Sequence, residues 1–155
     1  MVSDLTRLPR EAFPVFRRIP TRWGDNAVYG HVNNVVYYAF FDTAVNAELI
    51  DRKLLEPCGS GPIFVVAETR CRYFASLAFP VSIDIGIGVE RLGRTSITYV
   101  LGAYEAESAE PAAACRFVHV CVDRIDQRPQ AIPDPWRAVF ERELALWAGD
   151  DARRD

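Results

Sequence analysis

A run of apolar residues between positions 35 and 51 has the spacing of a helix. Its sequence is VVYYAFFDTAVNAELID, and apolar side chains return at every third or fourth position, which places them on one helical face. Asn33 or Asn34 is suited to cap its first turn, because a short side-chain oxygen accepts hydrogen bonds from unpaired amides. The pattern predicts one long, unusually apolar helix that needs a broad surface to lie on.

Most of the remaining segments alternate with the period of two that is typical of strands. In residues 81–89, Val and Ile alternate with polar residues or glycine, and β-prone runs also span 62–74, 95–104 and 112–123. A further strand is expected near 15–23, before the helix. A tight turn at Leu92-Gly93-Arg94 joins two of the runs into a predicted hairpin. We therefore expect an α+β fold in which a curved antiparallel sheet packs against the helix.

Two further features concern the packing around this sheet. Gly86 and Gly88 leave one face of their strand bare, so we expect another backbone to approach there. Asp134-Pro135 predicts the start of a terminal helix over about 135–148, since Asp caps helices and proline is favoured at the first helical position. The charged residues 149–155 are expected to fray.

Composition narrows the class of protein. The chain has 155 residues, half of them hydrophobic and a quarter charged, which favours a single folded domain over residues 1–155. Its net charge of −3 gives nucleic acid no general attraction, and no apolar stretch reaches the roughly 20 residues of a membrane span. Without a signal peptide or a CxxC pair, we expect a cytoplasmic protein whose four cysteines are buried, reduced thiols.

The segment before the long helix carries the candidate chemistry. Residues 22–34 read RWGDNAVYGHVNN and concentrate polar side chains at a helix N-terminus. There the unpaired amides and the positive end of the helix dipole suit an anion, or a carbonyl oxygen that becomes one. A capping loop without catalytic function would have the same residue types, so this pattern leaves both interpretations open.

The run Arg-Trp-Gly-Asp-x-x-x-x-Gly-His-Val-Asn-Asn, followed by an aromatic-rich helix with Asp42, resembles the 4-hydroxybenzoyl-CoA thioesterase family of hotdog-fold proteins. The segments 91–96 and 73–77 resemble that family's strand turn and the end of its second strand. The likeness spans about residues 15–130. It implies a long central helix wrapped by an antiparallel sheet, a homodimer or homotetramer with active sites between subunits, and hydrolysis of an acyl-CoA thioester.

The chain departs from the family pattern at Ala27. The family loop reads Asp-x-Asp-x-x-Gly, and its second carboxylate attacks the thioester or activates water; this chain keeps Asp25 and Gly30 but has Ala27 between them. A methyl group can neither take a proton nor attack a carbonyl. Three explanations are open: an engineered inactivation, another carboxylate such as Asp25, Asp42 or Glu68, or a protein that binds acyl-CoA or acyl carrier protein without hydrolysing it.

The resemblance also implies roles for individual residues. The catalytic candidates are position 27, the Asn34 amide as donor to the developing oxyanion, and Asp25 and His31, each of which could instead organise the loop. The substrate-binding candidates are Asn33, Tyr29, Arg94 and Ser96. We expect no metal and no cofactor, because His119, the only other histidine, lies in a strand segment with no ligand cluster. A third function, hydration of enoyl-CoA, is only faintly supported, since its Gly-Asp-x-Asn-Pro-x-His pattern is incomplete here.

Overall fold

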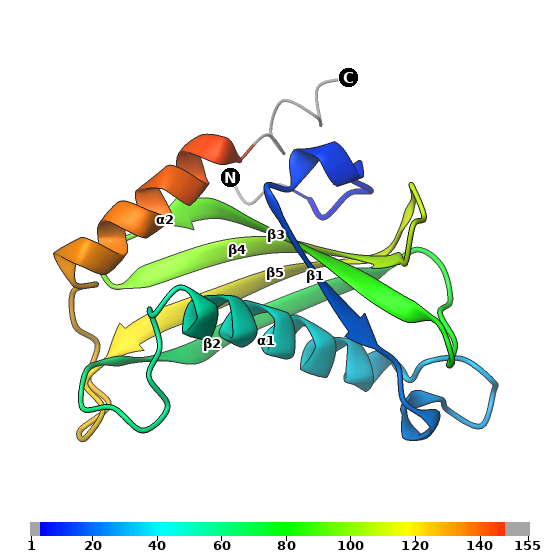
Figure 1. Cartoon of the computed structure of the whole chain (residues 1–155), viewed down its shortest axis with the longest axis horizontal. Coiled ribbons are helices and arrows are strands. Elements are labelled where there is room, and N and C mark those ends of the chain that lie inside the picture. Colours follow the sequence, from blue (N-terminus) through cyan, green and yellow to red (C-terminus); the bar gives the residue numbers. More distant parts are fainter. Residues whose placement is uncertain (1–3, 148–155) are drawn as a thin grey trace.

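The computed structural model describes residues 4–147 and contains one five-stranded sheet (Figure 1). The strands lie in the order β1-β3-β4-β5-β2, and all neighbouring pairs are antiparallel. In chain order the elements are η1 (Arg10–Ala12), β1 (Val15–Pro20), η2 (Trp23–Asp25), α1 (Asn34–Asp51), β2 (Ile63–Tyr73), β3 (Ser82–Leu92), β4 (Ser96–Glu105), β5 (Pro111–Val122) and α2 (Asp134–Leu146).

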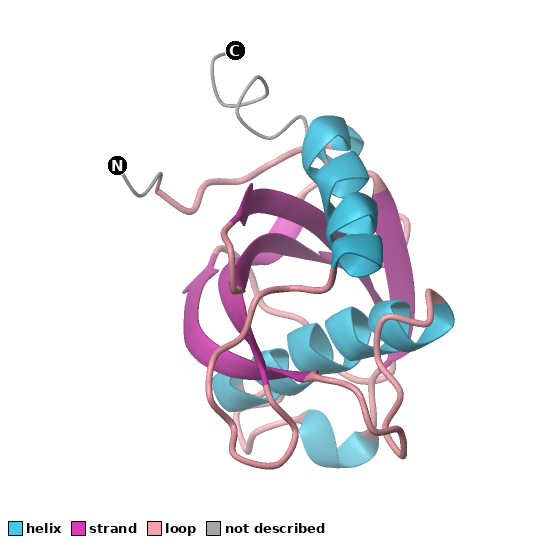
Figure 2. Cartoon of the chain, turned by 90° about the vertical axis from the view of Figure 1, so that its left-hand side faces the viewer, coloured by secondary structure: helices cyan, strands magenta, loops and turns pink. Residues whose placement is uncertain are grey.

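The sheet curves around α1, which lies across its inner side, while α2 runs at a steep angle to α1 (Figure 2). Residues at the predicted helical spacing are buried: Tyr37, Phe40, Phe41, Ala44, Val45 and Leu49. They join inward-facing residues of the strands in one apolar core. Burial of each large apolar side chain contributes about 1.5–3 kcal/mol. The predicted α+β hotdog architecture is therefore confirmed.

Some predicted boundaries were wrong. β1 ends at Pro20, whose ring nitrogen has no hydrogen to donate, and residues 23–25 instead form the short helix η2. α2 begins at Asp134, with Pro133 in the cap position and no side-chain cap bond. Residues 149–155, predicted to fray, lie outside the described residues.

The bare glycine face of β3 is filled by side chains, not by a backbone. A Cβ on Gly86 would lie 2.6 Å from the Phe13 ring, and one on Gly88 would collide with the Trp147 ring. These rings come from segments near the two ends of the chain, which cover the outer side of the sheet. The glycines are thus required for close packing of aromatic rings.

The cysteines agree only partly with the expectation. Cys115 and Cys121 are buried, Cys71 is half-buried and Cys58 is exposed; all four are free thiols. Burial raises the pKa of the Cys121 thiol, which keeps it protonated at neutral pH. No helix within residues 4–147 is long and apolar enough to cross a membrane.

His119 lies in β5 among aromatic rings and is 1% exposed. Its ring stacks on Phe64 at a centroid distance of 5.6 Å and meets the edge of Phe117 at 4.9 Å. Nδ1 has no hydrogen-bond partner among the described residues. Burial lowers the pKa of His119 from 6.5 to about 4, because the charged imidazolium is poorly solvated there.

His119 is expected to make the fold sensitive to mild acid. Its folded pKa lies below its unfolded pKa, so the stability it allows is complete above pH 6.5 and is lost as the pH falls toward 4. The loss is of order 3 kcal/mol in the free energy of unfolding. Urea titrations at several pH values should show this slope in the natural chain and a flatter profile in His119→Phe.

The pH range of this loss, from 6.5 to 4, lies above the range in which the buried carboxylate Asp84 titrates. Hydrogen bonds from Arg18, with a smaller contribution from Arg10, lower the pKa of Asp84 to about 2, so its contribution is lost below about pH 4. Equal slopes for the natural chain and His119→Phe between pH 6.5 and 4 would contradict the expectation.

Candidate active site

The loop that precedes α1 is a tight turn built on Ala27 and Gly30. The Gly30 amide donates to the Ala27 carbonyl at 3.0 Å, and the Ala27 amide donates to the His31 carbonyl at 2.8 Å. Gly30 has φ +86°, a conformation that side chains with a Cβ rarely adopt. The turn therefore sets position 27 opposite His31.

The residues between this turn and α1 are fixed by hydrogen bonds to two other segments. The Val32 amide donates to the Leu77 carbonyl at 2.7 Å, and the Asn33 amide donates to the Asp25 carbonyl at 2.9 Å. The Asn26 side chain accepts from the Phe79 amide at 3.0 Å. The loop is thus held from two sides: by the connection between β2 and β3 on one side and by η2 on the other.

The first turn of α1 is capped by Asn33, whose side-chain oxygen accepts from the Val35 amide at 3.3 Å. The Tyr73 hydroxyl donates to the Asn34 carbonyl at 3.0 Å. The Asn34 amide itself has no hydrogen-bond partner within residues 4–147. An unpaired amide at the positive end of a helix is suited to a partly negative oxygen.

An open hollow of about 380 Å³ lies at this helix start. It is lined by Ala27, Tyr29, His31, Val32, Asn33, Asn34, Tyr37, Tyr73, Ala75 and Ser76. The Tyr37 and Tyr73 rings meet edge to face at a centroid distance of 5.1 Å. Burial raises the pKa of both phenols, so they are neutral hydrogen-bond donors at physiological pH.

Five of the predicted site residues line this hollow, and Asp25 does not. The Asp25 carboxylate is buried. It accepts hydrogen bonds from the Arg22 backbone amide at 2.7 Å and from the Arg22 guanidinium at 3.0 Å. It therefore holds η2 in place, which is the loop-organising role considered for it.

The structure places Arg94 and Ser96 at the other end of the sheet, in the β3–β4 turn and at the start of β4 (Figure 1). The Arg94 carbonyl accepts from the Ile132 amide at 3.0 Å, close to the beginning of α2. Neither residue lines the hollow of its own chain.

The residues that line the hollow include no carboxylate. Asp42 of α1 is exposed, and its carboxylate accepts a hydrogen bond from the Asn46 side chain at 3.1 Å. Glu68 is exposed on β2. Within residues 4–147, no group of three or more His, Cys, Asp or Glu residues could hold a metal ion. His31 is thus the side chain on this lining whose neutral ring nitrogen can accept a proton.

Residues 21–140 match the family model described as the thioesterase-like superfamily. The chain belongs to this superfamily. A search of curated proteins gave no match.

Solved structures agree with this assignment. The PA5185 protein from Pseudomonas aeruginosa strain PAO1 is 48% identical, with a TM-score of 0.85, covering 89% of this chain and 96% of that one. A thioesterase from Thermus thermophilus, complexed with coenzyme A and Zn, is 29% identical, with a TM-score of 0.71, covering 89% and 98%. Slr0204, a 1,4-dihydroxy-2-naphthoyl-CoA thioesterase from Synechocystis, shares the fold at 14% identity and a TM-score of 0.72, covering 87% and 96%.

Tyr73, Ala75 and Ser76 line the hollow of this superfamily member but were absent from the predicted site. They lie at the end of β2 and just beyond it, about forty residues after the turn in sequence. The likeness of segment 73–77 to the family was the available signal. This segment lies beside the turn because the Leu77 carbonyl accepts a hydrogen bond from the Val32 amide, a tertiary contact that the sequence does not reveal.

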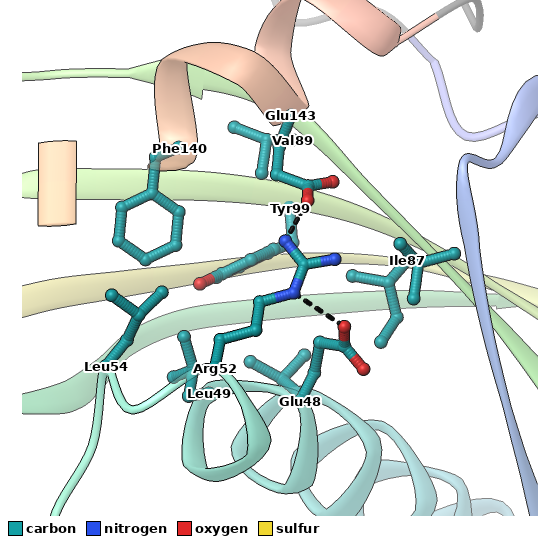
Figure 3. Close-up of a pocket in the computed structure, with 11 residues that line it drawn as sticks. Glu48, Leu49, Arg52, Leu54, Ile87, Val89, Tyr99, Phe140 and Glu143 are labelled. Carbon is teal, nitrogen blue, oxygen red and sulfur yellow. Dashed lines mark hydrogen bonds and ion pairs between the residues drawn. The ribbon is translucent and has the colours of Figure 1, made fainter. Parts of the chain in front are cut away.

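A small, largely apolar cavity of about 20 Å³ lies at the opposite end of α1 (Figure 3). Arg52 crosses it and pairs with Glu48 at 2.7 Å and with Glu143 of α2. The buried Tyr99 hydroxyl on its wall has no partner among the described residues. None of the predicted site residues lines this cavity, and its ion pairs tie α1 to α2.

The Asn33 cap is expected to be measurable as stability. Replacing it in Asn33→Ala removes the acceptor for the Val35 amide and should lower the free energy of unfolding by about 1 kcal/mol. Asn33→Asp keeps an acceptor and should lose much less. Chemical denaturation of both variants checks this, and equal loss in both would contradict the capping role.

Proposed function

We propose that the chain is an acyl-CoA thioesterase of the 4-hydroxybenzoyl-CoA thioesterase type, and that it acts in the cytoplasm. The observation that carries the proposal is the unpaired amide of Asn34, a residue that lines the hollow at the start of α1. Superfamily membership supports it, as does the thioesterase from Thermus thermophilus, whose structure holds coenzyme A.

In the proposed reaction, the thioester carbonyl oxygen accepts a hydrogen bond from the Asn34 amide. Water adds to the carbonyl carbon, and the negative charge that develops on the oxygen is stabilised by this amide and by the helix dipole. When the intermediate collapses, the carbon–sulfur bond breaks. The products are a carboxylic acid and the CoA thiol, which receives the proton released by water.

His31 is the proposed acceptor of the proton from water. It lines the hollow across the turn from Ala27, and no carboxylate lines the hollow with it. A positioned imidazole typically contributes 10² to 10⁴ in rate as a general base. Asn33 and Tyr29 line the same hollow and are proposed to contact the substrate.

A second copy of the chain is proposed to pair along β2. This 11-residue strand is bonded to β5 on one side and has no strand on its other side within residues 4–147. Such an edge is prone to pair with another strand. Antiparallel pairing centred on Thr69 would set Glu68 of each copy opposite Arg70 of the other, which is favourable.

The same pairing would bring Arg94 and Ser96, which do not line the hollow of their own chain, toward the hollow of the other copy. Ser96 pairs with Val120 on β5, which in turn pairs with Val65 near the start of β2. Antiparallel pairing brings the start of one β2 beside the end of the other, where Tyr73 borders the hollow. We therefore propose that Arg94 and Ser96 contribute to the site of the other copy.

A second candidate function is the binding of an acyl-CoA or acyl carrier protein without hydrolysis. The observation that favours it is the methyl group at position 27 in a hollow lined by no carboxylate. Here the unpaired amide would bind the thioester carbonyl in its ground state.

Asn34→Pro tests the proposed oxyanion contact. Proline is favoured at the first helical position, where it removes an amide hydrogen that makes no helical hydrogen bond, and Asn33 already has the extended conformation that precedes proline (ψ 136°). The turnover number for acyl-CoA hydrolysis should fall about 10²- to 10³-fold. Asn34→Ala, which keeps the amide, is the matched control. Equal rates in the two variants would contradict the contact.

Ala27→Asp separates hydrolysis from binding. A carboxylate at the turn would face the hollow and act as base or nucleophile, so thiol release from a panel of acyl-CoAs should rise by about 10²-fold. Measurable release by the natural chain supports the thioesterase proposal. Tight acyl-CoA binding without release in the natural chain supports the binding function. No gain in Ala27→Asp, together with hydration of enoyl-CoA by the natural chain, would refute both.

A further inference from the structure

A further open hollow of about 360 Å³ lies beside the candidate active site, at the end of β2. It is lined by Thr6, Arg7, Arg72, Tyr73 and Phe74. Tyr73 borders both hollows. Because successive residues of a strand point to opposite faces, Arg72 and Phe74 point away from the face on which Tyr73 reaches α1. The two hollows therefore flank the end of the same strand.

Two guanidinium groups are held at this hollow by one aromatic ring. The Arg7 guanidinium carbon lies 4.9 Å from the centre of the Phe74 ring, and that of Arg72 lies 5.9 Å from it. Arg72 also donates to the Leu5 carbonyl at 3.1 Å. Leu5 and Leu8 are buried, so the N-terminal segment is anchored on both sides of Arg7.

The charge of these two arginines is not balanced by the protein. Neither has a carboxylate within 4 Å among the described residues, and no carboxylate lines the hollow. Arg70, two residues before Arg72 on β2, pairs with Asp4 at 3.8 Å. Several other arginines of this acidic chain are paired with carboxylates: Arg10 and Arg18 with Asp84, Arg17 with Glu48, Arg52 with Glu143, and Arg116 with Glu90. What sets Arg7 and Arg72 apart is that both lie over the Phe74 ring at one hollow.

We propose that Arg7 and Arg72 form an anion subsite that binds the phosphate groups of the coenzyme A nucleotide. The inference rests on the proposed function and specifies how its substrate is recognised. With the acyl thioester at Asn34, the pantetheine arm would pass over Ala75 and Ser76, and the nucleotide would reach the second hollow. The planar guanidinium matches phosphate oxygens in pairs, and stacking on Phe74 reduces the rotamer freedom lost on binding.

Calorimetric titration with coenzyme A and with pantetheine tests this subsite, because pantetheine lacks every phosphate. The variants are Arg7→Gln, Arg7→Gln/Arg72→Gln, and the control Arg128→Gln/Arg142→Gln, which removes the same charge at two exposed arginines outside both hollows. The double variant should bind coenzyme A about tenfold more weakly than the control. Pantetheine affinity should be the same in all four proteins.

Arg7→Gln keeps the bond between Arg72 and Leu5, so it tests the subsite without loosening the N-terminal segment. Arg7→Gln should therefore weaken the binding of coenzyme A and leave the binding of pantetheine unchanged. Unchanged coenzyme A affinity in the double variant, or equal loss for coenzyme A and pantetheine, would overturn the inference.

Thiol release from an N-acetylcysteamine thioester, which has no nucleotide, separates this inference from the proposed function. Its rate should be equal in the natural chain and in the arginine variants. If the chain releases no thiol from any thioester while coenzyme A binding still depends on Arg7 and Arg72, the proposed function fails and the subsite stands.

Discussion

Two backbone hydrogen bonds fix the residues just before α1. The Val32 amide donates to the Leu77 carbonyl at 2.7 Å, and the Asn33 amide donates to the Asp25 carbonyl at 2.9 Å. Moving this segment would leave backbone groups unpaired, at about 1–3 kcal/mol for each buried one. The next amide, that of Asn34, is therefore held in a fixed position without a partner of its own among the described residues. A donor fixed in advance needs no reorganisation when charge develops on a bound oxygen.

The elements of the fold could be predicted largely from local pattern. Alternation over residues 81–89 and the turn at Gly93 give the β3–β4 hairpin, and the apolar spacing after Asn33 gives α1. The packing on the outer side of the sheet could not be predicted in this way. Gly86 and Gly88 accommodate Phe13 and Trp147, which lie far away in sequence, so the missing side chains show a need for space but not what fills it.

In the candidate site, too, the residues that are close in sequence could be predicted, and those brought in by tertiary contacts could not. Its turn is continuous in sequence, so residues from Ala27 to Asn34 lie together as their spacing suggests. Tyr73 and Ser76 reach it only because the β2–β3 connection crosses the loop. Asp25 shows the opposite case: its position in the motif suggests chemistry, yet its carboxylate is occupied by the amide and guanidinium of Arg22. Residue type and spacing do not reveal which hydrogen bonds a side chain has already made.

In the proposed function, binding and chemistry depend on different parts of this site. The unpaired amide, the tyrosines and the arginines beside Phe74 remain whatever residue stands at position 27, because the contacts that hold them do not involve that side chain. The methyl group at 27 offers no carboxylate there but leaves the loop's backbone bonds in place, since these join the Ala27 amide and carbonyl. In the proposed function, affinity for a thioester would therefore persist without the rate that a carboxylate would supply, and turnover would then depend on His31, which lines the hollow.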